Sequence, residues 1–95
     1  MPYDLFFLPQ AKKEWDLLNS TIKAQFKKKL AERLEEPEIA KDRLHGELKN
    51  CYKIKLRQVG YRLVYQVNKK EINILVIAIG RRDHDAVYLN SRTRF

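Results

Sequence analysis

The first 18 residues carry two different patterns of apolar positions. Residues 3–8 form a short apolar run before Pro9, which favours a buried strand ended by a breaker. Apolar residues then follow at the i, i+4, i+7 spacing that places side chains on one face of a helix: Ala11, Trp15 and Leu18. The pattern therefore predicts a strand followed by a helix.

A second helix is predicted after residue 18. Asn19 and Ser20 interrupt the first stripe, and either could cap the helix that follows. Its apolar residues are spaced by four throughout: Ile22, Phe26, Leu30 and Leu34. The stripe ends at Glu36, because Pro37 disfavours a helical conformation in the residue before it. Residues 37–50 show no clear period, so we expect a loop with one turn around residues 40–44.

The second half of the chain has the period of two that is typical of strands. Apolar and charged residues alternate over residues 51–57, which indicates a half-buried strand. A turn that contains Gly60 leads into a second alternating segment, residues 61–67, and a further turn leads to residues 72–79. This last segment is apolar on both faces, as is typical of a strand in the middle of a sheet. Gly80 is expected to end it.

The order of these elements predicts an α+β fold. Residues 86–89 suit a short C-terminal helix, followed by a basic tail at residues 91–95. An N-terminal strand, a helical hairpin and a three-stranded antiparallel meander combine most economically into one sheet with both helices on one face. A chain of this length fits one domain, which we expect to span residues 1–95.

Composition excludes several classes of protein. Hydrophobic residues make up 44% of the chain, which is enough for a core and excludes a wholly disordered chain. The longest apolar run, residues 74–79, is far shorter than the roughly 20 residues of a membrane-spanning helix. Cys51 is the only cysteine, which excludes an intramolecular disulfide and a zinc site built on several cysteines. We therefore expect a cytoplasmic protein without membrane contact.

The positive charge is concentrated in the second half of the chain. The net charge is +8, and residues 1–50 hold ten basic and nine acidic residues, whereas residues 51–95 hold ten and three. A one-sided excess indicates an anionic partner, most simply nucleic acid. Charge alone does not distinguish such a function from the weak binding of polyanions by any small basic protein.

A period of two gathers this charge on one face of the predicted sheet. The face collects Lys53, Lys55 and Arg57 from one strand and Arg62 and Gln66 from the next. Arg81 and Arg82 follow the central strand, and Tyr88 comes a few residues later. Several cations and one phenol could therefore converge near one edge, although an alternating basic face is more often a solvated surface.

The residues of this face can be compared with what the cleavage of RNA by the RNA's own 2′-hydroxyl requires. The reaction needs a base for the hydroxyl proton, positive charge on the transition state and an acid for the 5′ oxygen. A lysine becomes a base when neighbouring cations lower its pKa, and Lys53 and Lys55 are both placed for this. Arginine hardly deprotonates but suits a phosphate, so Arg62 and Arg82 would take those roles.

Other notable residues have a structural interpretation first. Three tyrosines fall on the apolar register and are expected in the core: Tyr52, Tyr61 and Tyr65. Lys27, Lys28 and Lys29 flank a buried stripe, so they indicate a solvated helix flank, with phosphate contact second. His45 and His84 are isolated and are expected to be bystanders, so neither a metal nor a cofactor is expected.

The meander resembles a known family of proteins. The resemblance is carried by residues 51–57, 60–67 and 80–82, with support from Lys13-Glu14-Trp15 and residues 27–30. In these segments the chain is similar to the RelE toxins of bacterial type II toxin–antitoxin systems, within the RelE/ParE superfamily. The resemblance implies a microbial-ribonuclease-like fold. It also implies a ribosome-dependent endoribonuclease that cuts messenger RNA in the ribosomal A site, leaves a 2′,3′-cyclic phosphate and inhibits translation.

The resemblance also implies a role for each position. Lys55 would be the general base with support from Lys53, and which of the two takes the proton stays open. Arg62 would stabilise the phosphate in the transition state, Arg82 would act near the leaving oxygen as acid or charge stabiliser, and Tyr88 would stack on or orient the substrate. Contacts to RNA are implied for Lys12, Lys13, Lys27, Lys28, Lys29, His45, Arg57 and Arg81.

The implied partners are a RelB-like antitoxin that blocks the cationic site, the 70S ribosome with its 16S rRNA, and messenger RNA. Operator DNA would be bound only by the toxin–antitoxin pair, which represses its own promoter. The chain departs from the family at two places. Leu44-His45-Gly46 stands where the family often has Leu-Arg-Gly, and Asp83-His84-Asp85 is more acidic than in close relatives. Both departures bear on the rate and pH dependence of cleavage.

Two other functions fit parts of the pattern. A ribosome or RNA binder without catalysis would keep the cationic face but would be indifferent to Lys55→Arg. A DNA-binding regulator could use the helical hairpin, but the second helix offers no distinct recognition face and the charge excess lies on the strands.

Overall fold

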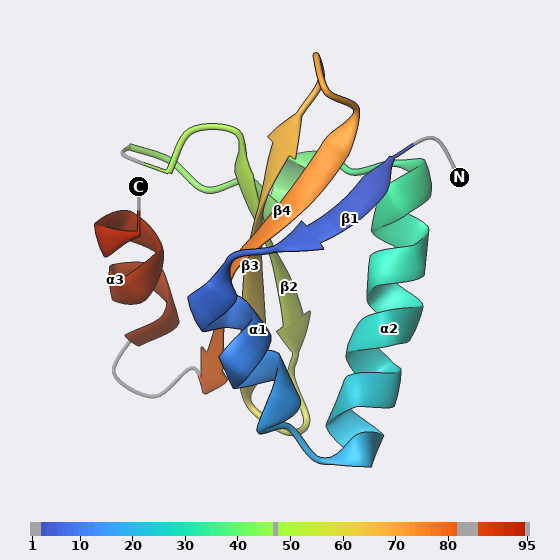
Figure 1. Ribbon diagram of the computed structural model, residues 1–95, viewed down its shortest axis with the longest axis vertical. Coiled ribbons are helices and arrows are strands. Elements are labelled where there is room, and N and C mark those ends of the chain that lie inside the picture. Colours follow the sequence, from blue (N-terminus) through green and yellow to red (C-terminus); the bar gives the residue numbers. More distant parts are fainter. Residues whose placement is uncertain (1–2, 47, 82–85, 95) are drawn as a thin grey trace.

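The chain forms a four-stranded sheet with helices on both faces (Figure 1). The structure, a computed structural model, describes residues 3–46, 48–81 and 86–94. Its elements in chain order are β1 (Asp4–Phe7), α1 (Pro9–Asp16), α2 (Ser20–Glu35), the 3-10 turn η1 (Ala40–Asp42), β2 (Cys51–Leu56), β3 (Tyr61–Asn68), β4 (Asn73–Arg81) and α3 (Ala86–Thr93). The predicted α+β fold of strand, helical hairpin, meander and C-terminal helix is confirmed.

The strand order in the sheet is β1-β4-β3-β2. The meander of β2, β3 and β4 is antiparallel, whereas β1 pairs parallel to β4 and lies at one edge. β4 is therefore an inner strand, as its unbroken apolar sequence predicted, and Ile74, Val76 and Ile77 on it are fully buried.

The first face of the sheet packs against the helical hairpin. Trp15 of α1 lies 6.3 Å from Phe26 of α2 between ring centroids, and Phe26 is fully buried. Of the two residues predicted to cap α2, it is Asn19 that does so, since its side chain accepts a hydrogen bond from the Ile22 amide at 2.9 Å. Tyr52 and Tyr65 are buried in this core, as their apolar register predicted, whereas Tyr61 is only half-buried and packs against it.

The second face is covered only in part. Val87 of α3 packs there with Cys51, Val64 and Ile77, and with Leu48 from the loop before β2. A β-bulge lies in this core, since the register of β3 and β4 shifts between Val64 and Tyr65 and leaves Ile77 as an extra residue. The two consecutive residues Ile77 and Ala78 both belong to this core as a result. α3 thus stands on the opposite side of the sheet from the helical hairpin (Figure 1).

Two predicted ends were wrong. β4 does not stop at Gly80 but continues to Arg81, because these two residues pair with Arg62 and Tyr61 of β3. The C-terminal helix does not stop at residue 89 but continues through most of the expected basic tail, since Ser91 is buried and its hydroxyl donates to the Val87 carbonyl at 2.7 Å.

None of the helices in the described ranges has the length and hydropathy needed to span a membrane.

The predicted start of β4 at residue 72 was also wrong by one position. Ile72 lies in the turn after β3 with a φ of 53°, and the strand starts at Asn73. Left-handed backbone is costly for a β-branched residue, and the Ile72 side chain is half exposed. This turn therefore holds strain that its side chain does not offset by burial.

We predict that Ile72→Asn raises the free energy of unfolding by about 1 kcal/mol, because asparagine tolerates the left-handed region. Urea denaturation followed by circular dichroism measures the change. Leu17→Asn is the matched control, since Leu17 is 87% exposed but lies in right-handed backbone. A loss of stability in Ile72→Asn equal to that in the control would contradict the strain.

Candidate active site

The cations of the meander lie on the half of the second face that α3 leaves uncovered. Lys53 and Lys55 point to this face from β2, and both are half-buried. The register places Lys55 directly opposite Arg62 of β3. Like charges so close repel one another, so the side chains of Lys55 and Arg62 do not stabilise the sheet through each other.

Arg62 connects this face to α3. Its Nη1 donates a hydrogen bond to the Tyr88 hydroxyl at 2.7 Å, and its guanidinium carbon lies 5.7 Å from the centre of the Tyr88 ring. Gly80 of β4 is paired with Arg62, and it has no side chain that could lie between Arg62 and Tyr88. The phenol thereby orients the guanidinium over the open face.

A cavity of about 320 Å³ opens beside this pair. We call it the cationic cavity, and its walls are Leu44, His45, Leu48, Lys53, Arg62, Tyr88 and Arg92. Arg92 is a residue that the sequence analysis missed, because the helix was predicted to end at residue 89. A longer helix would have shown the i, i+4 relation that puts Arg92 on the same side as Tyr88.

Lys55 lines a different cavity, of about 570 Å³, along the outer edge of β2. We call it the edge cavity, and its walls are Lys29, Arg33, Lys41, Asp42, Ile54, Lys55 and Arg57. Lys53 and Lys55 therefore line two separate hollows, although they stand on one strand two residues apart. Both hollows are rich in cations, as a groove for a phosphate backbone would be.

The pKa of Lys55 is lowered from its ordinary value. The positive charge of Lys53 is the main cause, followed by partial burial and then by the charges of Arg62 and Arg57. Each neighbouring cation disfavours a further positive charge. The lowered pKa means that a larger fraction of Lys55 is neutral at a given pH than of an ordinary lysine.

A buried network holds the backbone of β2 at Lys53. Nη1 of Arg33, on α2, donates to the Lys53 carbonyl at 3.2 Å and to the Tyr65 hydroxyl at 2.8 Å. Nη2 of Arg33 donates to Asp42 at 2.7 Å, and this ion pair is largely buried. The Tyr65 hydroxyl in turn donates to the Pro37 carbonyl at 2.6 Å, and burial raises the pKa of Tyr65 to about 12. No local pattern of residues predicts this network, because it depends on contacts between distant segments.

Comparison with known proteins supports one family. A family model described as "ParE toxin of type II toxin-antitoxin system, parDE" matches residues 5–86. The mRNA interferase toxin RelE of Escherichia coli strain K12 is 50% identical over 88 residues, which cover 93% of this chain and 92% of the relative. This chain belongs to the RelE/ParE family of toxins. The mRNA interferase RelE of Shigella flexneri matches with the same identity and coverage.

Solved structures of RelE have the same fold. A mutant of E. coli RelE in the free state has a TM-score of 0.91 and 46% identity, over 100% of this chain and 99% of that one. RelE in the intact E. coli RelBE toxin–antitoxin complex has a TM-score of 0.82 and 49% identity, over 86% of this chain and 99% of that one. The fold and the family predicted from the meander are thereby confirmed.

The remaining positions implied by the RelE resemblance are dispersed. Lys12 and Lys13 are exposed on α1, and Lys12 pairs with Asp16 at 2.6 Å. Lys27 and Lys28 are both exposed on α2, and Lys27 also borders an apolar groove between α2 and β1. Lys29 and Arg57 line the edge cavity, and His45 lines the cationic cavity.

The two arginines after the central strand differ. The Arg81 guanidinium lies 5.5 Å from the centre of the Tyr61 ring, and the register puts these two residues opposite each other. Arg81 therefore shares a face with Tyr61 and not with Arg62. Arg82 and the Asp83-His84-Asp85 segment lie outside the described residues, so the predicted role of Arg82 stays a prediction.

Neither the cysteine nor a metal cluster enters this site. Burial raises the pKa of Cys51 to about 12, so its thiol is not a nucleophile near neutral pH. Within residues 3–46, 48–81 and 86–94, no group of three or more His, Cys, Asp or Glu side chains could hold a metal ion. The cationic cavity instead brings together lysine, arginine, tyrosine and histidine side chains, from Lys53, Arg62, Tyr88, Arg92 and His45.

We predict that Lys53→Ala raises the pKa of Lys55, because it removes the main cause of the lowering. Titration of lysine side-chain carbon signals by NMR measures the pKa. Lys70→Ala, at the exposed turn between β3 and β4, removes the same charge far from the site and is expected to leave the Lys55 titration unchanged. An unchanged pKa in Lys53→Ala would contradict the assigned cause.

Proposed function

We propose that this protein is an endoribonuclease toxin that cleaves messenger RNA in the ribosomal A site, with residues 1–95 acting as one cytoplasmic toxin domain. The observation that carries the proposal is the pair of Lys55, with its lowered pKa, and Arg62 opposite it on the next strand. The names of the relatives, mRNA interferase and RelE, agree with this chemistry.

Lys55 acts as the general base. Its neutral amine takes the proton of a substrate 2′-hydroxyl, and that oxygen then attacks the adjacent phosphorus. A bond forms between the 2′ oxygen and phosphorus while the bond from phosphorus to the 5′ oxygen breaks, so the product carries a 2′,3′-cyclic phosphate. Lys53 supports this step through its charge, which lowers the pKa of Lys55 and so raises the fraction of that side chain that is neutral.

Arg62 stabilises the charge that develops on the phosphate. Guanidinium groups suit this task because they remain charged and donate several hydrogen bonds in one plane. Its hydrogen bond to Tyr88 fixes its direction before substrate arrives, which reduces the reorganisation needed in the transition state. Arg82 is proposed to protonate the leaving 5′ oxygen or to stabilise its charge.

The proposed partners are the ribosome, its message and an antitoxin. The cations of the edge cavity, among them Lys29 and Arg57, favour a phosphate backbone that runs past Lys55. Solved relatives include RelE in the E. coli RelBE complex and RelE with a peptide of the antitoxin RelB. We propose that a RelB-like antitoxin covers the cationic face of this chain as well, and that operator DNA is bound only by the resulting pair.

We predict that Lys55→Arg lowers the rate of cleavage on programmed ribosomes by at least about 100-fold, because arginine keeps the charge but does not accept the proton. The measurement is the single-turnover rate of cleavage of a short message held in the A site. Lys70→Arg at the distant turn is the control and keeps the wild-type rate. A protein that acts only by binding would inhibit translation equally well with Lys55→Arg, and that result would overturn the base assignment.

The pH dependence of the rate provides an independent prediction. Below the pKa of Lys55 the neutral fraction grows about tenfold per pH unit, so the rate rises with pH and then levels off. Lys53→Ala raises that pKa, so its rate at neutral pH falls and its plateau moves to higher pH. Single-turnover rates across pH test this. A profile in Lys53→Ala that falls in height but keeps its position would contradict the coupling.

A further inference from the structure

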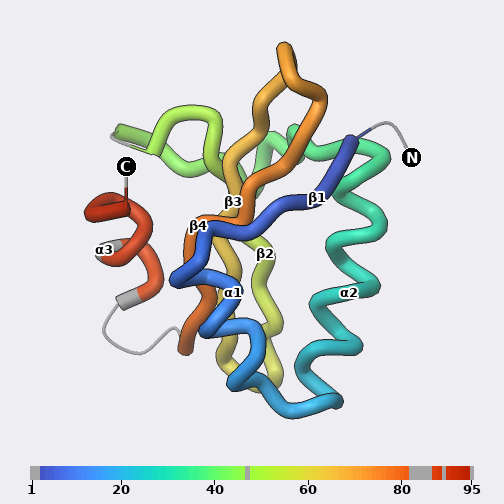
Figure 2. The backbone as a smooth tube through the Cα atoms, viewed as in Figure 1, coloured from blue at the N-terminus to red at the C-terminus, as the bar shows by residue number. Residues whose placement is uncertain are grey.

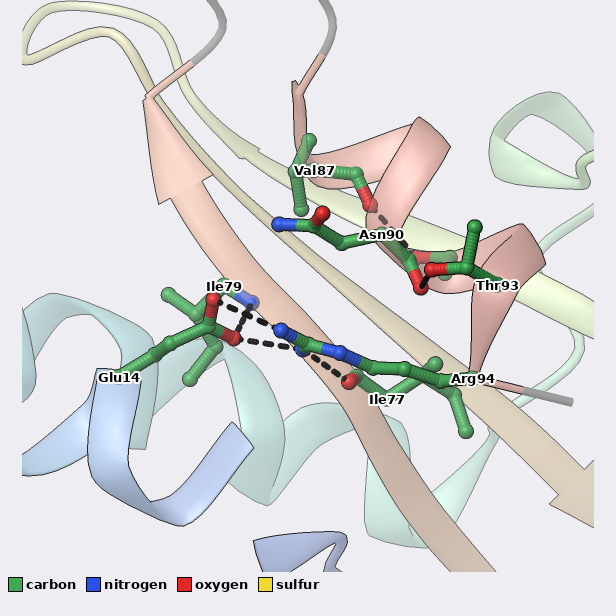
Figure 3. A network of polar contacts seen from close by, with 8 residues as sticks. Glu14, Ile77, Ile79, Val87, Asn90, Thr93 and Arg94 are labelled. Carbon is green, nitrogen blue, oxygen red and sulfur yellow. Dashed lines mark hydrogen bonds and ion pairs between the residues drawn. The ribbon is translucent and has the colours of Figure 1, made fainter. Parts of the chain in front are cut away.

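An ion pair connects the C-terminal end of α3 to α1. Arg94, which directly follows α3, forms a two-pronged contact with Glu14 of α1 (Figure 3). Nη1 of Arg94 lies 2.8 Å from Oε1 of Glu14, and Nη2 lies 3.2 Å from Oε2. The two side chains are 14% and 25% exposed, so water screens this pair less than a surface pair.

The pair lies beside β4, beyond the end of β1, where no strand among the described residues pairs with that side of β4. β1 ends at Phe7, opposite Val76, and the chain turns away into α1 while β4 runs on to Arg81 (Figure 2). Beyond that point the Ile77 carbonyl accepts from Nη1 of Arg94 at 2.8 Å, and the Ile79 amide donates to Oε1 of Glu14 at 3.1 Å. Backbone groups at a sheet edge need partners, and these two side chains supply them.

α3 needs such a fastening because it is short. A helix of eight residues is not stable alone in water, so its position depends on tertiary contacts. Among the described side chains of α3, Val87 and Ser91 are buried and Tyr88 packs against the core in part. The Ser91 hydroxyl donates to the helix's own Val87 carbonyl, so this hydrogen bond does not connect the helix to the sheet. Arg94 stands six residues beyond Tyr88, about 9 Å along a helix axis.

We propose that Glu14 and Arg94 are positioning residues for the cleavage reaction, which fasten the end of α3 and thereby hold Tyr88 on Arg62. The proposal rests on the proposed function, because it assigns the pair to that same site. Without the ion pair, α3 spends part of its time away from the sheet, and Arg62 loses its hydrogen bond to Tyr88. The effect falls on the chemical step, since neither residue lines the cationic cavity.

The first test compares rates on programmed ribosomes that carry a short message. Arg94→Met and Glu14→Gln are expected to lower the single-turnover rate by about 10- to 100-fold, the usual cost of misplacing a group at a reacting centre. The ribosome concentration for half-maximal rate is expected to stay within about twofold, because RNA contacts are unchanged. Arg94→Lys keeps a cation near Glu14 and restores part of the rate. Lys70→Met is the charge-matched control and keeps the wild-type rate.

The second test shows whether the effect passes through Tyr88. In a Tyr88→Ala background, Arg94→Met is expected to slow the reaction by less than about twofold further, because the group that it positions is already gone. Hydrogen exchange supplies a readout without activity. Amides of residues 86–94 are expected to exchange faster in Arg94→Met than in wild type, while those of β2 and β3 exchange at wild-type rates.

Different results overturn different parts of the account. Penalties of Arg94→Met and Tyr88→Ala that simply multiply, or wild-type exchange of residues 86–94 in Arg94→Met, would overturn the positioning role. Cleavage by Arg94→Met at the wild-type rate would overturn this proposal and leave the proposed function standing. A wild-type protein that leaves the message intact would overturn both.

Discussion

The partial cover that α3 gives to the second face of the sheet is the constraint on which the site depends. Val87 closes a small core with Cys51 and Val64, and this core ends where Lys53 and Lys55 begin. A helix long enough to cover β2 would bury these lysines, and no cover at all would leave the apolar residues of β4 in water. The same helix carries the tyrosine that orients Arg62.

Like charges on the open half of this face oppose folding, and contacts elsewhere offset them. The core between the sheet and the helical hairpin contains most of the large buried side chains, among them Phe26, Ile54 and Tyr65. Arg33 adds a hydrogen bond from α2 to the Lys53 carbonyl, so the strand that carries the lysines is connected to the helical hairpin. A loss of stability of this kind, here from repulsion between like charges at the site, is a common cost of activity.

The sequence predicted the architecture well because its apolar periods are regular. Stripes spaced by four specified the helices, and alternation specified the meander and the face that holds Lys53, Lys55 and Arg62. The errors arose where distant contacts decide. β4 passes Gly80 because β3 pairs with it there, and α3 passes residue 89 because Ser91 is buried. The bonds of Arg33 and Arg94 join segments far apart in the chain, which no local pattern encodes.

Ribosome-dependent cleavage is tested most directly by mapping new 5′ ends on messages translated by ribosomes mixed with the purified protein, beside the same messages without ribosomes. We expect cuts at a fixed position within the A-site codon, with 2′,3′-cyclic phosphate ends, only when ribosomes are present, and no cuts with Lys55→Arg. Intact messages with the wild-type protein, or equal cutting by Lys55→Arg, would contradict the proposed mechanism.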